Sequence, residues 1–267
     1  MIWQSIKLAF HKLGSPPVFS VFARRLAPWL WAAFLACTLY GVYLALYVAP
    51  PDYQQGDSAR ILYIHVPAAW QALLGYLIMA VLAAIALIWR IRTAEIMAMA
   101  AAPIGAGLTL ICLVTGSLWG KPMWGTWWEW DARLTSMLVL LFIYVGIMAL
   151  YAAYDDPRKG ARVASILVIA GLVNLPIIHF SVEWWTTLHQ GQTIRVFGES
   201  SMHPSMIPPL IWTTLGTKFL FGAALLDRAR NLLLAQDQHK RWVQRELAPE
   251  LEDAPRADPI ERGTTIQ

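Results

Sequence analysis

The stretch 66–88, which reads VPAAWQALLGYLIMAVLAAIALI, decides the fold. It contains no charged side chain and is long enough to cross the hydrocarbon core of a bilayer, which takes about 20 apolar residues in a helix. Inside lipid, only helices and closed barrels satisfy every backbone N–H and C=O group. The segment therefore predicts a transmembrane α-helix.

Five further segments have the same character, and the composition agrees with them. The chain is 57% hydrophobic and only 14% charged, whereas soluble domains carry about 25% charged residues. We therefore predict an all-α membrane protein, a bundle of six transmembrane helices. The expected spans are 28–48, 66–88, 97–119, 132–151, 163–179 and 206–226.

Lysine and arginine predict the orientation, because cytoplasmic loops of membrane proteins are enriched in both. Most of the 21 such residues fall in the N-terminal segment, in alternate loops and in the tail. The other set of loops holds Arg60, Lys121, Arg133 and Arg195, while Lys218 lies within the last span. Both termini are thus expected in the cytoplasm. Three segments then face outward: 50–65, 120–131 and 180–205.

The chain accordingly divides into three regions: a cytoplasmic N-terminal segment (1–27), a six-helix transmembrane domain (28–227) and a cytoplasmic tail (228–267). Within the tail, residues 229–247 read as an amphipathic helix, which either lies on the membrane surface or docks to a cytoplasmic partner. The acidic, proline-containing stretch beyond Pro249 is expected to be disordered.

The sequence lacks the motifs of a signal peptide, of a redox or heme-attaching cysteine pair and of an ATPase. Residues 1–25 have no apolar core followed by a small-residue cleavage site, so no cleavable signal peptide is expected. Cys37 and Cys112 sit in apolar runs outside any CxxC or CxxCH pattern, which argues against redox chemistry and covalent heme attachment to this chain. There is no Walker-type phosphate loop. The net charge of +4 follows membrane topology and does not indicate nucleic-acid binding.

Tryptophan is concentrated around the second outward segment. Five of the 14 tryptophans lie there: Trp119, Trp124, Trp127, Trp128 and Trp130. An interfacial aromatic belt explains one or two tryptophans per helix end, but not five together. They would form a broad, flat apolar surface with faces suited to offset stacking, so we expect a planar macrocycle as ligand. Asp131 follows them and is expected to cap the fourth span.

These residues carry a family resemblance. Residues 124–136, WGTWWEWDARLTS, resemble the tryptophan-rich WWD signature of heme-handling proteins that serve cytochrome c maturation. The flanking texts 61–70 (ILYIHVPAAW) and 181–191 (SVEWWTTLHQG) extend the resemblance to the CcmC family, over about 28–227. Glu129 departs from the family, in which this position is more often apolar. We expect its side chain to point to water at the rim.

The resemblance implies a function and partners. A CcmC-like protein is a multi-pass protein of the bacterial inner membrane that holds heme at the periplasmic face and delivers it to the heme chaperone CcmE. It works in a complex with the ATP-binding cassette subunits CcmA and CcmB and the small membrane protein CcmD. ATP hydrolysis then belongs to a partner, and this chain is not expected to be a conventional enzyme, although it can template heme attachment to the chaperone.

Histidine supplies the candidate iron ligands, because neutral imidazole is a common axial ligand of heme. The outward histidines are His65, His179, His189 and His203. A bis-histidine site needs one imidazole on each face of the heme ring. By resemblance to the family, His65 and His189 match the two ligating histidines and imply heme b with bis-histidine iron. His179 is expected to hydrogen-bond within the bundle, and His203 to begin a helix.

Other side chains complete the predicted site. Arginine pairs with carboxylates bidentately, so Arg60 and Arg133 are candidates to hold the heme propionates; contact with lipid headgroups is the alternative for each. Trp184 and Trp185, close before His189, are expected to add to the apolar surface.

Two rival functions use the same residues differently. A heme-conducting channel would need polar side chains along the spans, for which Lys218, Asn174 and scattered threonines are the only candidates. An electron-transfer cytochrome b would place its histidines inside the helices to stack hemes across the membrane, whereas here they lie at the outer rim.

Overall fold

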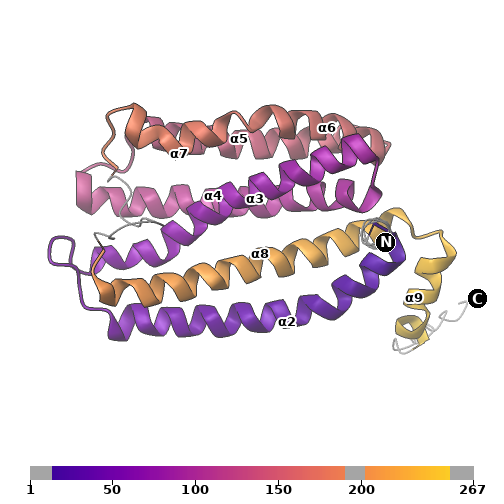
Figure 1. Ribbon diagram of the computed structural model, residues 1–267, viewed down its shortest axis with the longest axis horizontal. Coiled ribbons are helices and arrows are strands. Elements are labelled where there is room, and N and C mark those ends of the chain that lie inside the picture. The colour runs from indigo at the N-terminus through magenta and orange to yellow at the C-terminus, as the bar shows by residue number, and fades with distance from the viewer. Residues whose placement is uncertain (1–13, 190–201, 253–267) are drawn as a thin grey trace, which may run out of the picture.

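The computed structural model describes residues 14–189 and 202–252, which form a bundle of long helices (Figure 1). Six helical segments of the described part are long and apolar enough to span a membrane, so the predicted all-α, six-span architecture is confirmed. The elements are α2 (Pro16–Tyr43), η1 (Leu44–Val48), η2 (Asp57–Ile61), α3 (Leu62–Trp89), α4 (Arg92–Trp124), α5 (Ala132–Ala152), α6 (Pro157–Gly171), α7 (Asn174–Trp184), η3 (Pro204–Met206), α8 (Ile207–Gln236) and α9 (Arg241–Glu252).

The helices are arranged around α3 and α4. In Figure 1, α5, α6 and α7 lie on one side of these two helices, and α8 and α2 lie on the other. In the most apolar stretch of α4, 67% of the residues are buried, whereas in that of the α2 segment only 17% are buried. The α2 helix packs mainly against α8, so both expose long apolar faces, as helices in lipid do.

The ends of several spans differ from expectation. The first helix begins at Pro16, well before residue 28, because proline is tolerated in the first turn of a helix. The third helix runs past residue 119 to Trp124 and stops at Gly125, which caps it with a positive φ of 78°. The outward segment expected at 120–131 is therefore shorter, and Trp119 and Trp124 lie on α4.

The fifth span, expected as one helix over 163–179, is two helices. Pro176 has no N–H to offer the carbonyl of Leu172, so the helical ladder is interrupted there. At the break the hydroxyl of Tyr76 donates to the Val168 carbonyl at 2.9 Å. The Asn174 amide donates to the Ser136 carbonyl at 3.0 Å. The Tyr76 bond satisfies a carbonyl at the break, as buried backbone in lipid requires, and the Asn174 bond holds the start of α7 against α5.

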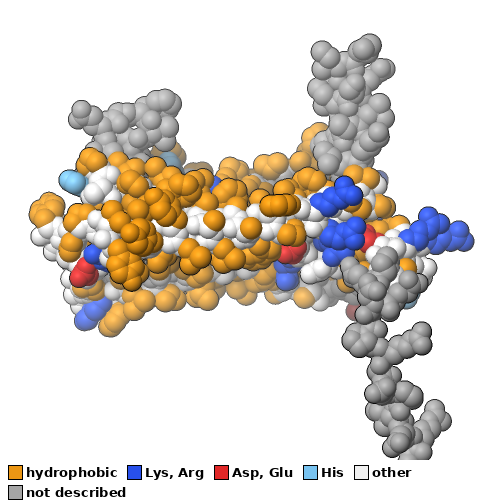
Figure 2. Space-filling view, turned by 90° about the horizontal axis from the view of Figure 1, so that it is seen from below, with side chains coloured by type: hydrophobic (Ala, Val, Ile, Leu, Met, Phe, Trp, Pro, Cys, Tyr) orange, Lys and Arg blue, Asp and Glu red, His pale blue; other side chains and the backbone are white. Residues whose placement is uncertain are grey.

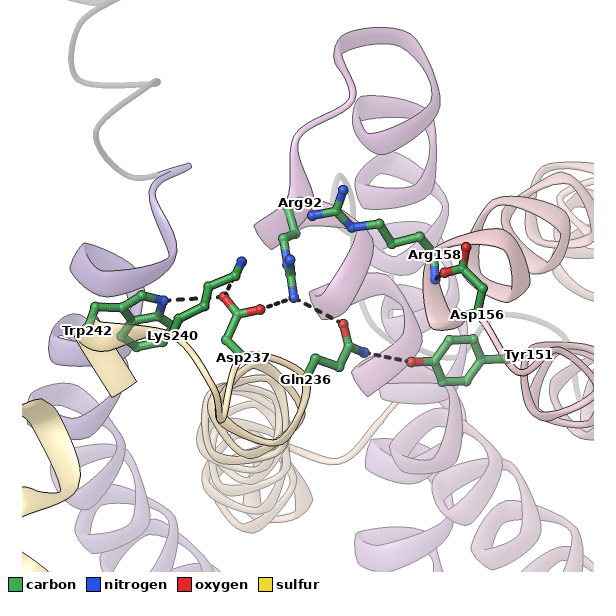
Figure 3. Close-up of polar contacts among 8 residues, drawn as sticks. All are labelled: Arg92, Tyr151, Asp156, Arg158, Gln236, Asp237, Lys240 and Trp242. Atoms are coloured by element: carbon green, nitrogen blue, oxygen red, sulfur yellow. Dashed lines mark hydrogen bonds and ion pairs between the residues drawn. The ribbon is translucent and has the colours of Figure 1, made fainter. Parts of the chain in front are cut away.

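At the opposite end of the bundle, the expected amphipathic helix over 229–247 is also divided. The α8 helix extends the last span to Gln236, and α9 starts after a turn. The carboxylate of Asp237 fixes that turn, since it accepts from Arg92, from Lys240 at 3.0 Å and from the Trp242 indole at 3.3 Å (Figure 3). The Gln236 amide reaches the hydroxyl of Tyr151 at 3.0 Å. The described part of α9 is thereby tied to the bundle.

Charge is distributed as a membrane protein requires. Figure 2 shows hydrophobic side chains along the length of the molecule and a concentration of lysine and arginine over the end that carries α9. The start of α2 lies at the same end (Figure 1). Which side of the membrane this end faces stays a prediction from the lysine and arginine pattern. Arg195 and the tail beyond Glu252 lie outside the described residues.

The close packing of α4 on α5 yields a stability prediction. A β-carbon on Gly105 would collide with the ring of Tyr144, which is fully buried and donates to the Ala72 carbonyl at 3.1 Å. Overpacking costs about 1–3 kcal/mol, so Gly105→Ala should lower the thermal midpoint of the purified protein in detergent. On the same helix, a β-carbon at Gly107 meets nothing within 4 Å. Gly107→Ala should be neutral or slightly stabilising, and equal losses in both variants would contradict this packing.

Candidate functional site

The predicted site residues gather at the end of the bundle opposite α9. Here α3 begins, α4 ends, α5 begins and α7 ends (Figure 1). His65 lies in the first turn of α3, and His189 follows α7 in the chain. The structure therefore brings the two histidines to the same end of the molecule.

The hydrogen bonds of His65 fix which ring nitrogen carries its proton. Nδ1 of His65 lies 3.1 Å from Oγ1 of Thr115. The Thr115 hydroxyl donates its own proton to the Ile111 carbonyl at 2.6 Å, so it accepts from Nδ1–H. Nε2 of His65 then keeps a lone pair, which is what a metal ion requires. The next residue on α4, Gly116, makes room for the ring, because a β-carbon there would sit 3.0 Å from its Cε1.

His189 has the same arrangement with a different partner. Its Nδ1 lies 2.9 Å from Oδ2 of Asp131, and an ionised carboxylate can only accept. Nδ1 therefore carries a proton, so in the neutral ring the lone pair lies on Nε2. The carboxylate–imidazole pair is largely buried, with side-chain exposures of 5% for Asp131 and 16% for His189. A carboxylate behind a ligating imidazole is a common way to fix the orientation of a metal ligand.

Asp131 serves two elements at once. Its Oδ1 accepts from the Leu134 N–H at 2.7 Å, so it is the N-cap of α5, as predicted. Burial by itself would raise the pKa of Asp131, but the hydrogen bonds from the His189 ring and the Leu134 N–H hold that pKa below its ordinary value. The carboxylate thus stays ionised, which favours the protonated Nδ1 of the neighbouring imidazole.

Two tryptophans of α4 hold the two imidazoles. The Trp119 ring packs edge-to-face with His65 at 5.8 Å between centroids, and Trp124 with His189 at 4.9 Å. They are five residues apart, which is about 7.5 Å along a helix axis. The two imidazoles also lie near enough to interact electrostatically. One helix therefore serves as the common support of both candidate ligands.

The two candidate arginines are placed differently. Nε of Arg133 donates to Oγ of Ser181 at 3.1 Å, and the terminal amino groups of its guanidinium have no acceptor within the described part of the chain. Arg60 binds the Asp57 carboxylate at 2.8 Å and the carbonyls of Ala45 and Ala49, and so fixes the end of η1 to η2. Both propionate roles stay predictions, and the structure leaves Arg133 better able to meet a ligand.

The remaining tryptophans form a more exposed surface. Trp127 and Trp130 are 56% and 73% exposed, and Trp184 and Trp185 are 56% and 49% exposed. Trp128 packs partly against the core, and its indole N–H has no partner among the described residues. Glu129, between these residues, is exposed, in agreement with the expected position at the rim. The tryptophans predicted to form one flat surface thus divide into two groups. Trp119 and Trp124 pack against the histidines, whereas Trp127, Trp130, Trp184 and Trp185 are exposed.

Two histidines lie outside this arrangement. His203 caps η3, because its Nδ1 accepts from the Ser205 N–H at 3.3 Å and bonds the Ser205 hydroxyl at 2.8 Å. Its predicted role at a helix start is confirmed. His179 is exposed and packs on the Phe180 ring at 4.7 Å. Its expected hydrogen bond within the bundle is not found in the described part of the chain.

Sequence reasoning missed the partners that support the site. Thr115 bonds His65, Gln55 accepts from the Trp119 indole at 3.0 Å, and Ser181 bonds Arg133. One signal was available for Thr115: it is a polar residue on an apolar helix, one turn before Trp119. The other two partners come from distant segments, and their contacts depend on how the helices pack.

Comparisons with known proteins agree in family. Residues 9–244 match the family model described as CcmC, heme exporter protein C. Heme exporter protein C of Escherichia coli K12 is 49% identical over 242 residues, covering 91% of this chain and 96% of that protein. That of Bradyrhizobium diazoefficiens is 46% identical over 222 residues, covering 83% and 84%. A protein of Marchantia polymorpha described as ccmC-like, mitochondrial and of cytochrome c biosynthesis is 46% identical over 198 residues, covering 74% and 84%. The similarity extends through all six spans.

Proposed function

The chain belongs to the CcmC family of heme exporter proteins, and from this membership we propose that it binds one heme, as cargo, between His65 and His189. It is a heme-handling membrane protein of cytochrome c biogenesis. The proposed binding site lies at the periplasmic face of the bacterial inner membrane, where the lysine and arginine pattern puts this end of the bundle.

One observation carries the proposal. Two imidazoles from separate segments lie at the same end of the bundle, each with Nδ1 bonded to a partner, so that the neutral ring offers the lone pair of Nε2. Heme iron accepts two axial nitrogen ligands of this kind. The residues present fit the cargo, since they combine two imidazoles, several exposed indoles and a guanidinium whose terminal amino groups have no partner among the described residues.

The surroundings suit transfer of the cargo. The exposed indoles of Trp127, Trp130, Trp184 and Trp185 leave an apolar surface that a second protein can reach. We infer that the periplasmic chaperone CcmE docks there and takes the heme. CcmA and CcmB, with the small protein CcmD, would complete an ATP-binding cassette complex, with ATP hydrolysis in the partner. This chain binds, orients and presents heme and has no assigned catalytic residue.

The channel alternative gains no support from Asn174 or Lys218. Asn174 is buried and bonded to the Ser136 carbonyl, where it holds the start of α7 against α5. Lys218 is exposed on α8. The two do not share an internal path.

Arg133 offers a test of how heme is oriented. A hydrogen bond to a charged group contributes about 1.5–3 kcal/mol, so Arg133→Gln should weaken heme binding by about tenfold or more. The remaining heme should keep its low-spin spectrum, because the axial ligands are untouched. Titration of the heme-free purified protein with heme would measure this. Arg158→Gln, at the opposite end of the bundle, should bind as the unmodified protein does, and equal affinity of both variants would contradict a propionate role.

Transfer of heme from this protein to CcmE tests the proposed function as a whole. Purified heme-loaded protein, mixed with heme-free CcmE in the presence of the ATP-binding cassette subunits and ATP, should lose its heme absorption as the chaperone acquires heme. Protein that carries no heme when purified from cells with normal heme supply would contradict the proposal.

A further inference from the structure

We propose that the exposed face of α8 around Lys218 is the docking site for a transmembrane helix of a partner subunit, and that this helix carries a carboxylate at the same depth. The inference rests on the proposed assembly into a multisubunit complex. It concerns a surface remote from the heme site.

Lys218 lies near the middle of the apolar segment Pro204–Gln236, which is long enough to span a membrane. It is nine residues before Asp227 and eleven after Ile207, about 13 and 16 Å along the helix axis. The neighbouring α2 gives a similar depth. A β-carbon on Gly216 would collide with Thr38, which lies ten residues before the end of the segment Pro16–Val48, about 15 Å along the helix axis. Asp227, which accepts from the Trp31 indole at 2.7 Å, marks the inner boundary, where tryptophan prefers to lie.

The ammonium group cannot reach water from this depth by extending its side chain. A lysine side chain spans about 6 Å from its Cα, which is less than half the distance to either end of the span. Intramembrane lysines usually face a protein interior or pair with another polar group. Lys218 is instead exposed on the outside of the bundle, and none of the described residues forms an ion pair with it.

The same face has the shape of a helix-packing surface. Ile211 and Leu215 precede Lys218 at helical spacing and are 51% and 36% exposed. These side chains give a second helix an apolar surface to pack against beside the ammonium group.

The positive charge of Lys218 indicates which kind of helix would pack on this face of α8. A second copy of this chain, docked by a two-fold axis through this face, would bring two lysines together. Lipid alone leaves the ammonium uncompensated. An aspartate or glutamate on a partner helix would compensate the charge, and it would also fix the register of the two helices, as intramembrane polar pairs do.

The test uses the assembled complex in membranes. A photo-crosslinking amino acid at Leu215 should join this chain to a partner peptide that has an aspartate or glutamate within one helical turn. The same probe at Ile166, 60% exposed on α6, should not join that peptide. Cross-links from position 215 only to lipid, to a second copy or to a helix without an acid would overturn the proposal.

Reversing the charge at position 218 is the second part of the experiment. Lys218→Glu should reduce recovery of the cross-linked subunit at least tenfold, Lys218→Arg should retain it, and changing the partner's acid to lysine should restore assembly with Lys218→Glu. Lys159→Glu, at an exposed position at the end of the bundle that carries α9, is the matched control and should assemble normally. Normal assembly of Lys218→Glu would overturn the proposal. The heme spectrum should be unchanged in every Lys218 variant, so failure here is distinguishable from failure of the heme site.

Discussion

Replacing His189 by alanine is expected to abolish the low-spin heme spectrum of the purified protein, and replacing His65 should do the same. Each variant keeps one imidazole, so heme that still binds would be high-spin with a single axial ligand. Because even outer partners of a metal ligand contribute 10–100-fold to affinity, loss of a ligand should lower heme content by at least about tenfold. Absorption spectra at matched protein concentration measure both effects.

Controls separate ligation from folding. His179 is exposed on α7 and His203 caps η3, so alanine at either position should leave the low-spin spectrum intact. Added imidazole should restore the spectrum of His189→Ala more readily than that of His65→Ala, since His65 is packed against α4 beside Gly116. An unchanged low-spin spectrum in His65→Ala or His189→Ala would remove that residue from the site.

The second large effect is expected at Asp131, where one carboxylate both caps α5 and orients His189. Asp131→Ala removes both bonds. It should cost about 1 kcal/mol of stability through the lost cap, and about 10–100-fold in heme affinity through the lost support of the ligand. Heme titration and thermal unfolding of the same preparation would report the two losses separately.

Asp131→Asn distinguishes the two roles. Asparagine is as good an N-cap as aspartate, so the amide oxygen can still accept from the Leu134 N–H. The amide nitrogen would then face Nδ1–H of His189, donor against donor, and the imidazole would lose its orientation. We expect near-normal thermal stability with weakened heme binding.

The matched control for capping is Asp156. Its side chain accepts from the Arg158 N–H at 2.9 Å and caps α6 at the end of the bundle that carries α9. Asp156→Ala should lose a comparable amount of stability without any change in heme affinity. If Asp131→Ala weakened heme binding no more than Asp156→Ala did, the supporting role of Asp131 would be excluded.

The six spans were predictable because hydropathy over about 20 residues is a strong and local signal. Their ends were less so. Nothing between Trp119 and Gly125 stops α4, since Pro122 is accommodated within its last turns, and the helix ends only where a glycine adopts a positive φ. The break before Asn174 depends on Pro176 together with Tyr76 from another helix. Such long-range compensation cannot be read from one segment.

The candidate ligands were also identified from the sequence, but through family resemblance, because spacing alone cannot bring positions 65 and 189 together. The structure adds support for the proposed roles: Thr115 and Asp131 each occupy Nδ1, and Trp119 and Trp124 pack against the two imidazoles from one helix. Arg60 and Arg133 looked equivalent in the sequence. Their contacts in the structure distinguish them, because the guanidinium of Arg60 binds groups of η1 and η2, whereas Arg133 bonds only through Nε among the described residues.

We propose that a single heme iron takes one axial nitrogen from each of these two histidines. Electron–nuclear double resonance on oxidised protein, labelled with nitrogen-15 in histidine only, counts those nitrogens directly. Two labelled axial nitrogens are predicted for the unmodified protein and one for each of His65→Ala and His189→Ala. Two remaining in either variant, or none in the unmodified protein, would contradict the account.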